Sequence, residues 1–173
     1  MTGALALIRD FVNTRDIDAG RDALGTPGAL EEWLRARGLA PRDLTVRDWK
    51  AALSIREGLR HILACHNGAK EDPAQIASLN AALVSQPVRV KASAGGRLGW
   101  GKARDAALGD LGAVLSEAVA DPEWARLKVC RNDACRWAFF DASRNRSHKW
   151  CSMRACGNLM KARAYRSRKK VGG

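Results

Sequence analysis

The sequence lacks long apolar runs. None of its 173 residues belongs to an uninterrupted apolar stretch of the about 20 residues that a membrane-spanning helix needs. The apolar run near the N-terminus, residues 4–8, ends at Arg9 and Asp10, and it is shorter than the core of about 7–15 residues in a signal peptide. We therefore expect a cytoplasmic protein with no membrane partner, in a compartment where thiols stay reduced.

The sequence also lacks the short patterns that accompany common catalytic sites. Residues 1–124 contain no glycine-rich phosphate loop, no nucleophile elbow and no paired carboxylates suited to acid–base catalysis. From Ala125 onward there is no glutamate, so that segment lacks the proton shuttle that a zinc deaminase requires. These absences predict a protein that is not an enzyme.

Acidic residues are scarce in the last third of the chain, and this scarcity accounts for the net charge of +12. Residues 1–124 contain 16 lysines and arginines and 16 acidic residues, whereas residues 125–173 contain 14 basic residues and only Asp133 and Asp141 as acids. The whole excess therefore lies in the C-terminal segment. Such segregation indicates a neutral domain followed by a segment that binds a polyanion, although a basic tail can also serve solubility alone.

Residues 1–124 are predicted to form a mainly helical domain with one small β-hairpin. Thr26-Pro27 and Thr45 with Asp48 are typical helix starts, because threonine caps the first turn and proline suits its first position. Around residues 88–101 the sequence pattern changes from helical spacing to the two-residue spacing of a strand. Residues 93–96 favour a turn, so this segment is predicted to form the hairpin. The expected helices cover residues 5–13, 27–38, 46–68 and 104–120, with a further one from Pro73; Leu108, Leu111, Leu115 and Val119 form the apolar face of the helix at 104–120.

Four of the five cysteines lie close together near the C-terminus. Their spacing is Cys130-x4-Cys135, then fifteen residues, then Cys151-x4-Cys156. Each close pair can supply two thiolates from one tight turn, as a tetrahedral zinc site requires. Four protein ligands leave the metal no open position, so the pattern predicts one structural Zn²⁺ rather than a catalytic ion. Two disulfides are the alternative, and His148 could replace one cysteine as a ligand, although it fits neither pair's spacing.

The segment around these cysteines is predicted to be a treble-clef-like zinc finger. It has few aliphatic side chains, so it buries too little apolar surface to fold without metal. A short strand is expected at Trp137–Phe140, with Trp137 and Trp150 packed in the interior of the finger, although these aromatic side chains could instead stack on nucleic-acid bases. Ser152 is expected to cap a helix over residues 153–169. One face of that helix is expected to turn towards the metal and the strand, with Met153, Cys156, Met160 and Ala164 on it.

The basic side chains of this segment are expected to form a cationic surface on the loop before Cys151 and on the outer side of the helix. Such a surface suits the phosphate backbone of nucleic acid, and Asn158 or Arg163 could reach base edges. The candidate nucleic-acid contacts are Arg144, Arg146, Lys149, Arg154, Asn158, Lys161, Arg163, Arg166, Arg168, Lys169 and Lys170.

At these residues the sequence resembles the CGNR-type zinc finger. The similarity rests on residues 124–130, 135–141, 150–158 and 161–166, which together cover nearly the whole segment. In that family the finger follows an ABATE domain, whose early signature is matched by Asp-Phe-Val-Asn-Thr at residues 10–14. The resemblance implies a bacterial, stress-linked transcription regulator whose finger binds DNA.

One position departs from the family pattern. The namesake run is Cys-Gly-Asn-Arg, whereas Leu159 follows Asn158 in this chain. If the family arginine contacts phosphate, this protein makes roughly one phosphate contact fewer, and its DNA binding is weaker and depends correspondingly less on salt. If that arginine is structural, Leu159 indicates a local repacking and DNA binding is unchanged.

The leading hypothesis is a zinc-dependent, DNA-binding transcription regulator. Residues 1–124 would be an ABATE-like domain for sensing or for forming a homodimer, and residues 125–173 the basic finger. An RNA- or ribosome-associated protein is the alternative, because phosphate contacts serve both polymers. A third hypothesis is a small-molecule sensor, in which Asp10, Asn13 and Thr14 contact an effector ligand or the other domain; these three residues could equally form a helix end with ordinary side-chain-to-backbone bonds.

Overall fold

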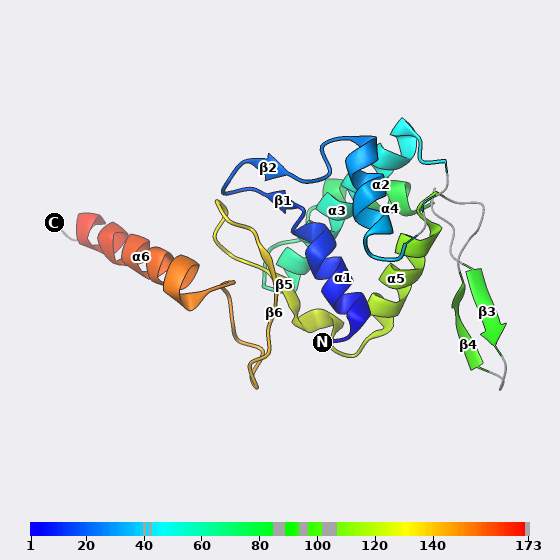
Figure 1. Cartoon of the computed structure of the whole chain (residues 1–173). Helices are drawn as coiled ribbons and strands as arrows, with labels where there is room; N and C mark the ends of the chain where they lie inside the picture. Colours follow the sequence, from blue (N-terminus) through cyan, green and yellow to red (C-terminus); the bar gives the residue numbers. More distant parts are fainter. Residues whose placement is uncertain (40, 42, 85–88, 94–96, 102–106, 172–173) are drawn as a thin grey trace.

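The computed structural model describes residues 1–39, 41, 43–84, 89–93, 97–101 and 107–171. For residues 89–93, 97–101 and 169–171 it describes the backbone only. Figure 1 shows a helical body from which one C-terminal helix extends. The predicted class, mainly α with a small β-hairpin and a four-cysteine finger at the C-terminal end, is confirmed. Within the described part of the chain, no helix combines the length and the apolar character needed to cross a membrane.

Helix α1 (Gly3–Val12) lies in the core of the body. The Thr2 side chain caps it by accepting the N–H of Leu5. The apolar side chains recur at the three- and four-residue spacing that places them on one face. This face contacts α3, α5 and the strand β6, so the helix links the body to the finger. Its fully buried side chains are Leu5, Ile8, Phe11 and Val12.

The next two helices begin at the predicted caps. Helix α2 (Pro27–Arg35) starts after Thr26, and α3 (Val46–Cys65) starts with a capping box in which Thr45 and Asp48 bond to each other's backbone N–H. The segment after α3 turns at Gly68, whose φ of 85° favours glycine. The residues at each N-terminus were therefore sufficient to predict where α2 and α3 begin.

A short antiparallel pair, β1 (Arg15–Asp16) with β2 (Arg21–Asp22), connects α1 to α2 and was not predicted. Two-residue strands made of arginine and aspartate carry no alternating apolar pattern. The pair is held from outside by Arg56 of α3, whose guanidinium makes two bonds of 2.6 and 2.7 Å to the carboxylate of Asp22. The pair therefore depends on a tertiary contact.

Helix α4 (Pro73–Val84) packs on α3, and β3 (Arg89–Ser93) pairs with β4 (Arg97–Gly101) as the predicted hairpin, whose turn at residues 94–96 lies outside the described residues. Helix α5 (Gly109–Ala120) begins later than predicted: residues 104–106 lie outside the description, and residues 107–108 form a turn. The prediction for Val119 was wrong, because its side chain is 53% exposed while Ala118 is buried. Helix α5 packs on α1, and the period of its apolar face does not show how far that cover extends.

The finger begins with a 3₁₀ turn (Trp124–Arg126) and two antiparallel strands, β5 (Leu127–Val129) and β6 (Ala138–Phe140). Strand β5 packs on α3 and β6 packs on α1. Leu127, Val129 and Ala138 belong to the same apolar core as the helices. The finger's sheet is therefore part of the body's packing.

The last helix consists of a π-helical turn (Met153–Gly157) followed by α6 (Asn158–Val171). Ser152 caps it as predicted, accepting the N–H of Ala155. The predicted inward face is only partly correct: Cys156 is buried and Met160 is half-buried, but Met153 is 46% exposed and Ala164 is exposed. Figure 1 shows the reason: α6 points away from the body, so the body's described helices and strands do not cover that face.

Candidate metal centre and basic helix

The four cysteines predicted as metal ligands lie together. Their sulfur atoms are all within 4.8 Å of one another. The sulfur of Cys151 lies 3.7 Å from that of Cys135 and 3.8 Å from that of Cys156. A tetrahedron with Zn–S bonds of about 2.3 Å has edges of about 3.8 Å. The cluster therefore has the size of a zinc site, and all of its thiols are free rather than joined in disulfides.

The first pair of cysteines is held by a tight turn after β5. The N–H of Cys130 donates to the carbonyl of Trp137 at 2.9 Å, which closes the turn. Within the turn, the carbonyl of Asn132 accepts the N–H groups of Cys135 at 2.8 Å and Arg136 at 2.9 Å. Arg136 has a φ of 48°, which lets the chain reverse within this turn. The two sulfurs are thus brought together by backbone bonds.

The second pair of cysteines, Cys151 and Cys156, is also brought together by a backbone hydrogen bond. The N–H of Gly157 donates to the carbonyl of Ser152 at 2.9 Å, which brings Cys156 back towards Cys151. The N–H of Arg131 donates to the carbonyl of Lys149 at 3.1 Å and ties the first turn to the segment before the second. The two turns are therefore joined by a backbone hydrogen bond.

The environment of the sulfurs suits a cation. Burial raises the pKa of Cys135 to about 11, and burial together with the neighbouring Cys130 also raises the pKa of Cys151. Burial acts in the same direction on Cys156, but the amide of Asn132, which donates to its sulfur at 3.5 Å, leaves that pKa lowered. Crowded thiolates repel one another, so the cluster is stable in its ionised form only with a cation among them.

His148 lies outside the sulfur cluster. Its side chain is 57% exposed, and its Nδ1 is 3.6 Å from a carboxylate oxygen of Asp141. Among the described residues, the group that can hold a metal comprises the four cysteines alone. The structure assigns His148 to the loop before the second pair of cysteines and not to the metal.

A buried ion pair organises that loop. The Nζ of Lys128 lies 2.8 Å from Oδ2 of Asp141, and both side chains are almost wholly buried. Lys128 also donates to the carbonyl of Arg146 at 2.6 Å. Burial alone would raise the pKa of Asp141, but Lys128 and the two donors of Ser143 hold it well below its usual range. The loop is thereby fixed with the side chains of Arg144 and Arg146 exposed.

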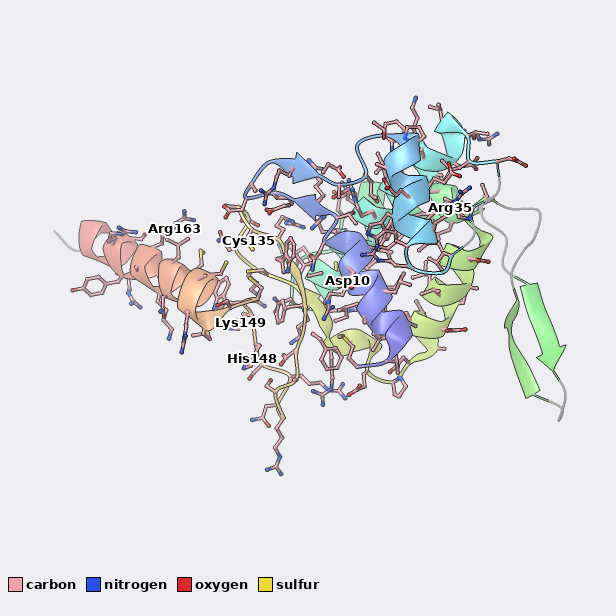
Figure 2. The ribbon with its side chains drawn as sticks, in the orientation of Figure 1. Asp10, Arg35, Cys135, His148, Lys149 and Arg163 are labelled. Atoms are coloured by element: carbon pink, nitrogen blue, oxygen red, sulfur yellow. The ribbon has the colours of Figure 1, made fainter. Side chains whose placement is uncertain are left out.

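The predicted nucleic-acid contacts occupy this loop, the π-helical turn and α6. Figure 2 shows Arg163 on α6 and Lys149 in the segment before it, on the side of the molecule away from Asp10 and Arg35. The side chains of Lys169 and Lys170 lie outside the description. Each of the other nine candidates is exposed, namely Arg144, Arg146, Lys149, Arg154, Asn158, Lys161, Arg163, Arg166 and Arg168.

The three N-terminal candidates lie near the end of α1 and have different surroundings. The side chain of Asn13 exchanges two hydrogen bonds with the backbone of Ala138 in the finger. The hydroxyl of Thr14 donates to a carbonyl of α1 at 2.7 Å, as at an ordinary helix end. Asp10 forms an ion pair with Arg9 at 2.7 Å. Asn13 therefore joins the two parts of the chain.

Side chains of α3 and the turn after it also hold the finger, and the sequence analysis missed them. Buried Arg60 donates to the carbonyl of Arg136 at 3.0 Å and to a carbonyl at the end of α1 at 2.6 Å. Asn67 donates to the carbonyls of Val129 at 2.8 Å and Lys149 at 2.9 Å. The only signal in the sequence was an arginine on the buried side of a predicted helix. A buried arginine requires hydrogen-bond partners, but the sequence does not show which residues supply them.

A cleft of about 690 Å³ lies where α1 and α2 meet the finger. Asp10, Asn13 and Trp33 line it from the body, and Trp137 and Cys151 line it from the finger. Trp137 was predicted to pack in the finger's interior, but it is 38% exposed beside this cleft. Because Cys151 is one of the four clustered cysteines, the cleft reaches the metal centre.

Residues 4–124 match the ABATE family, whose description is "Putative stress-induced transcription regulator". The chain belongs to the ABATE family. Residues 126–169 of this ABATE protein match the CGNR zinc finger, which confirms the resemblance read from the sequence. None of the curated proteins compared with it matches.

The finger match and the sulfur geometry together support a single structural Zn²⁺ in this ABATE protein, as predicted. Cys130, Cys135, Cys151 and Cys156 would hold the ion. Bound there, it would cross-link the two turns and offset the repulsion between thiolates. Four sulfur ligands leave no coordination position for a substrate.

Proposed function

We propose that this protein is a DNA-binding transcription regulator that contacts DNA through α6 and the basic loop before it. The observation that carries the proposal is a helix that projects from the body with its described cations exposed. The sequence of α6 contains no acidic residue. An α-helix of about 10–12 Å in diameter fits a B-DNA major groove about 12 Å wide.

The composition of α6 supports a polyanionic partner. Isolated helices of fewer than about 12–15 residues are marginal in water; this one has 14 residues, and among the described elements it packs mainly on the π-helical turn before it. Its cations stand three and four residues apart, as Arg163 and Arg166 do, and therefore repel one another. Phosphate groups along a duplex would remove that repulsion, whereas an apolar partner would not.

The zinc centre is proposed to direct this helix and not to take part in a reaction. Cys156 lies in the π-helical turn that leads directly into α6, two residues before Asn158, so the ion would fix the helix at its start. Arg60 and Asn67 hold the cysteine-bearing turns against the body, so the direction of α6 would follow the ABATE domain. The proposal implies a bacterial cytoplasmic regulator without enzymatic activity.

DNA is favoured over RNA by the shape of the basic element. The major groove of A-form RNA is deep and narrow and does not admit a helix, whereas that of B-DNA does. The loop carrying Arg144 and Arg146 is held by a buried ion pair, so it offers a second rigid contact to a regular backbone. A rigid two-point surface suits a duplex better than a flexible single strand.

The test is fluorescence anisotropy of the zinc-loaded full chain with labelled duplex DNA over a range of salt concentrations. A double variant, Arg163→Gln with Arg166→Gln, should lower the slope of log affinity against log salt by about 1.8, since each phosphate contact contributes about 0.9. The matched control is Arg35→Gln with Arg47→Gln, which removes the same charge from exposed positions on the body.

Two outcomes would overturn the proposal. The first is the absence of binding to duplex DNA at low salt by a sample with full zinc content. The second is an equal loss of slope in the control variant, which would mean that net charge and not α6 governs binding. Competition with an RNA duplex of the same length tests the RNA alternative, and light scattering on the same sample tests the predicted homodimer.

A further inference from the structure

The cleft between α1, α2 and the finger has no part in the proposed DNA contact. It is lined by residues of the body and of the finger, whereas Arg163 lies on α6, which points away from the body (Figure 2). Its volume of about 690 Å³ falls within the range of about 300–1,000 Å³ typical of small-molecule sites. Its lining comes from both the ABATE domain and the finger.

Most polar groups in the cleft are already satisfied. Both polar atoms of the Asn13 amide bond to Ala138, and the hydroxyl of Thr14 donates to the backbone of α1. Asp10 accepts from Nε and Nη2 of Arg9 at 2.8 and 2.7 Å, so these two charges offset each other. None of these groups needs a ligand to complete its bonding.

Arg37 is different. Its guanidinium stacks 4.0 Å above the ring of Trp33, and one of its nitrogens donates to the Trp33 carbonyl at 3.2 Å. No carboxylate in the described part of the chain pairs with it. The side chain is exposed at the cleft, held in position by an aromatic ring and a helix end. Among the described residues that line the cleft, Arg37 therefore carries a positive charge that no carboxylate pairs with, and its location is defined.

The opposite wall is aromatic. Trp137 is 38% exposed, although its neighbour Ala138 is buried, and Phe139 beside it is half-buried. Both aromatic side chains line the cleft. Arg37 covers one face of Trp33, and Phe11 packs against that ring at 5.5 Å. The aromatic side chains that the finger contributes to the lining are those of Trp137, Phe139 and Phe140, of which Trp137 is the most exposed, and planar rings stack favourably on such surfaces.

We propose that this cleft binds a small anionic aromatic molecule, such as an aryl carboxylate or sulfonate. The anion pairs with Arg37, and the ring packs against Trp137 and Phe139. The site goes beyond the proposed function and does not depend on it. Because Cys151 lines the same cleft, an occupant contacts the zinc finger as well as the ABATE domain.

The test is an NMR titration of the zinc-loaded full chain with naphthalenesulfonate, and with naphthalenemethanol as a neutral probe carrying the same ring. The indole N–H signals are assigned by single Trp→Phe variants. The signals of Trp33 and Trp137 should shift with naphthalenesulfonate. The signal of Trp49 should not, because its indole N–H donates to the Leu24 carbonyl at 2.8 Å outside the cleft.

Charge specificity is tested by a matched pair of variants. Arg37→Gln should weaken naphthalenesulfonate binding about tenfold, the effect of losing one charge-assisted hydrogen bond, and leave the neutral probe unaffected. Arg35→Gln, two residues away and paired with Glu31, should leave both probes unchanged. Trp137→Ala should weaken both probes.

Three results would overturn the inference: no shift at millimolar probe, equal binding of the anionic probe to Arg37→Gln and the original chain, or a Trp49 shift as large as that of Trp137. Each titration is performed without DNA. A failure here therefore leaves the proposed DNA contact untouched, and a failure of DNA binding leaves this site untouched.

Discussion

The side-chain amide of Asn13 forms two hydrogen bonds with the backbone of Ala138. Its Nδ2 donates to the carbonyl at 2.9 Å, and its Oδ1 accepts the N–H at 2.7 Å. Asn13 is the C-cap of α1, and Ala138 is the first residue of β6, 125 positions later. The amide therefore acts as an extra peptide group at the edge of the finger's sheet and fixes that sheet to the helical body.

Replacing this amide should lower the free energy of unfolding of the whole chain. Asn13→Asp keeps the size but places a charged acceptor against the Ala138 carbonyl, so we expect a loss of about 2 kcal/mol in the free energy of unfolding. Urea unfolding of the zinc-loaded protein measures this. Asn145→Asp, at an exposed position of the finger, should change stability by less than about 0.5 kcal/mol. Equal losses in the two variants would contradict the role of the Asn13–Ala138 pair.

Removing zinc should lower the melting temperature of the whole chain and not only that of the finger. The finger's Leu127, Val129 and Ala138 lie in the same core as the helices, so freeing the cysteine turns loosens that core. Thermal unfolding before and after a chelator checks this. Cys135→Ser should reproduce the effect with a reduced metal-to-protein ratio by mass spectrometry, whereas Cys65→Ser, outside the cluster, should retain one zinc per chain.

The ion pair of Asp141 and Lys128 should make stability depend on pH. The folded-state pKa of Asp141 lies below 3.8, so its contribution is fully present above about pH 3.8 and is lost as the pH falls towards the folded-state pKa. Asp141→Asn leaves Lys128 buried without a counter-charge and should cost about 3 kcal/mol near pH 7. It should also flatten the decline in stability between about pH 4 and pH 3.

Urea unfolding at several pH values measures both effects of Asp141→Asn. Asp133→Asn is the control, because Asp133 belongs to the same finger but its side chain is 95% exposed. Acid release of zinc affects both variants alike, so the difference between them isolates the ion pair. An unchanged pH slope in Asp141→Asn would show that the ion pair does not produce it.

Leu159 provides a test of the departure from the family's namesake run. It lies in the first turn of α6 and is 41% exposed. If this position faces phosphate, Leu159→Arg should raise the salt slope of DNA binding by about 0.9 and tighten binding at low salt. Val119→Arg, at an exposed position of α5, adds the same charge away from the finger and should do neither. An unchanged slope in Leu159→Arg would favour a structural role for the family arginine.

Predictions that depended on neighbouring residues agree with the structure. Thr26 and Thr45 cap their helices because a hydroxyl and the N–H groups two or three residues later meet in any helix start. The two cysteine pairs converge because each spans one tight turn. Such arrangements need only the local chain, and the family match adds the order of the two modules.

Predictions that depended on what covers a surface were less successful. Val119 and Ala164 satisfy the helical period of an apolar face, yet both are exposed, because none of the described elements covers them. The pair β1–β2 has no apolar pattern and forms around Asp22 and Arg56, 34 residues apart. Periodicity shows which residues share a face of a helix, but not whether another element lies opposite.

The sequence by itself determined the zinc ligands and the location of the positive charge, because ligand spacing and charge segregation are properties of a short, continuous segment. Only the tertiary structure decided how that segment is held: Asn13, Arg60 and Asn67 bond to backbone carbonyls of the finger. A backbone carbonyl is present at every residue, so no side-chain pattern marks the one that a distant amide or guanidinium will find. The exposure of α6 and the cleft beside Arg37 follow from the same docking, which brings together groups that are far apart in the chain.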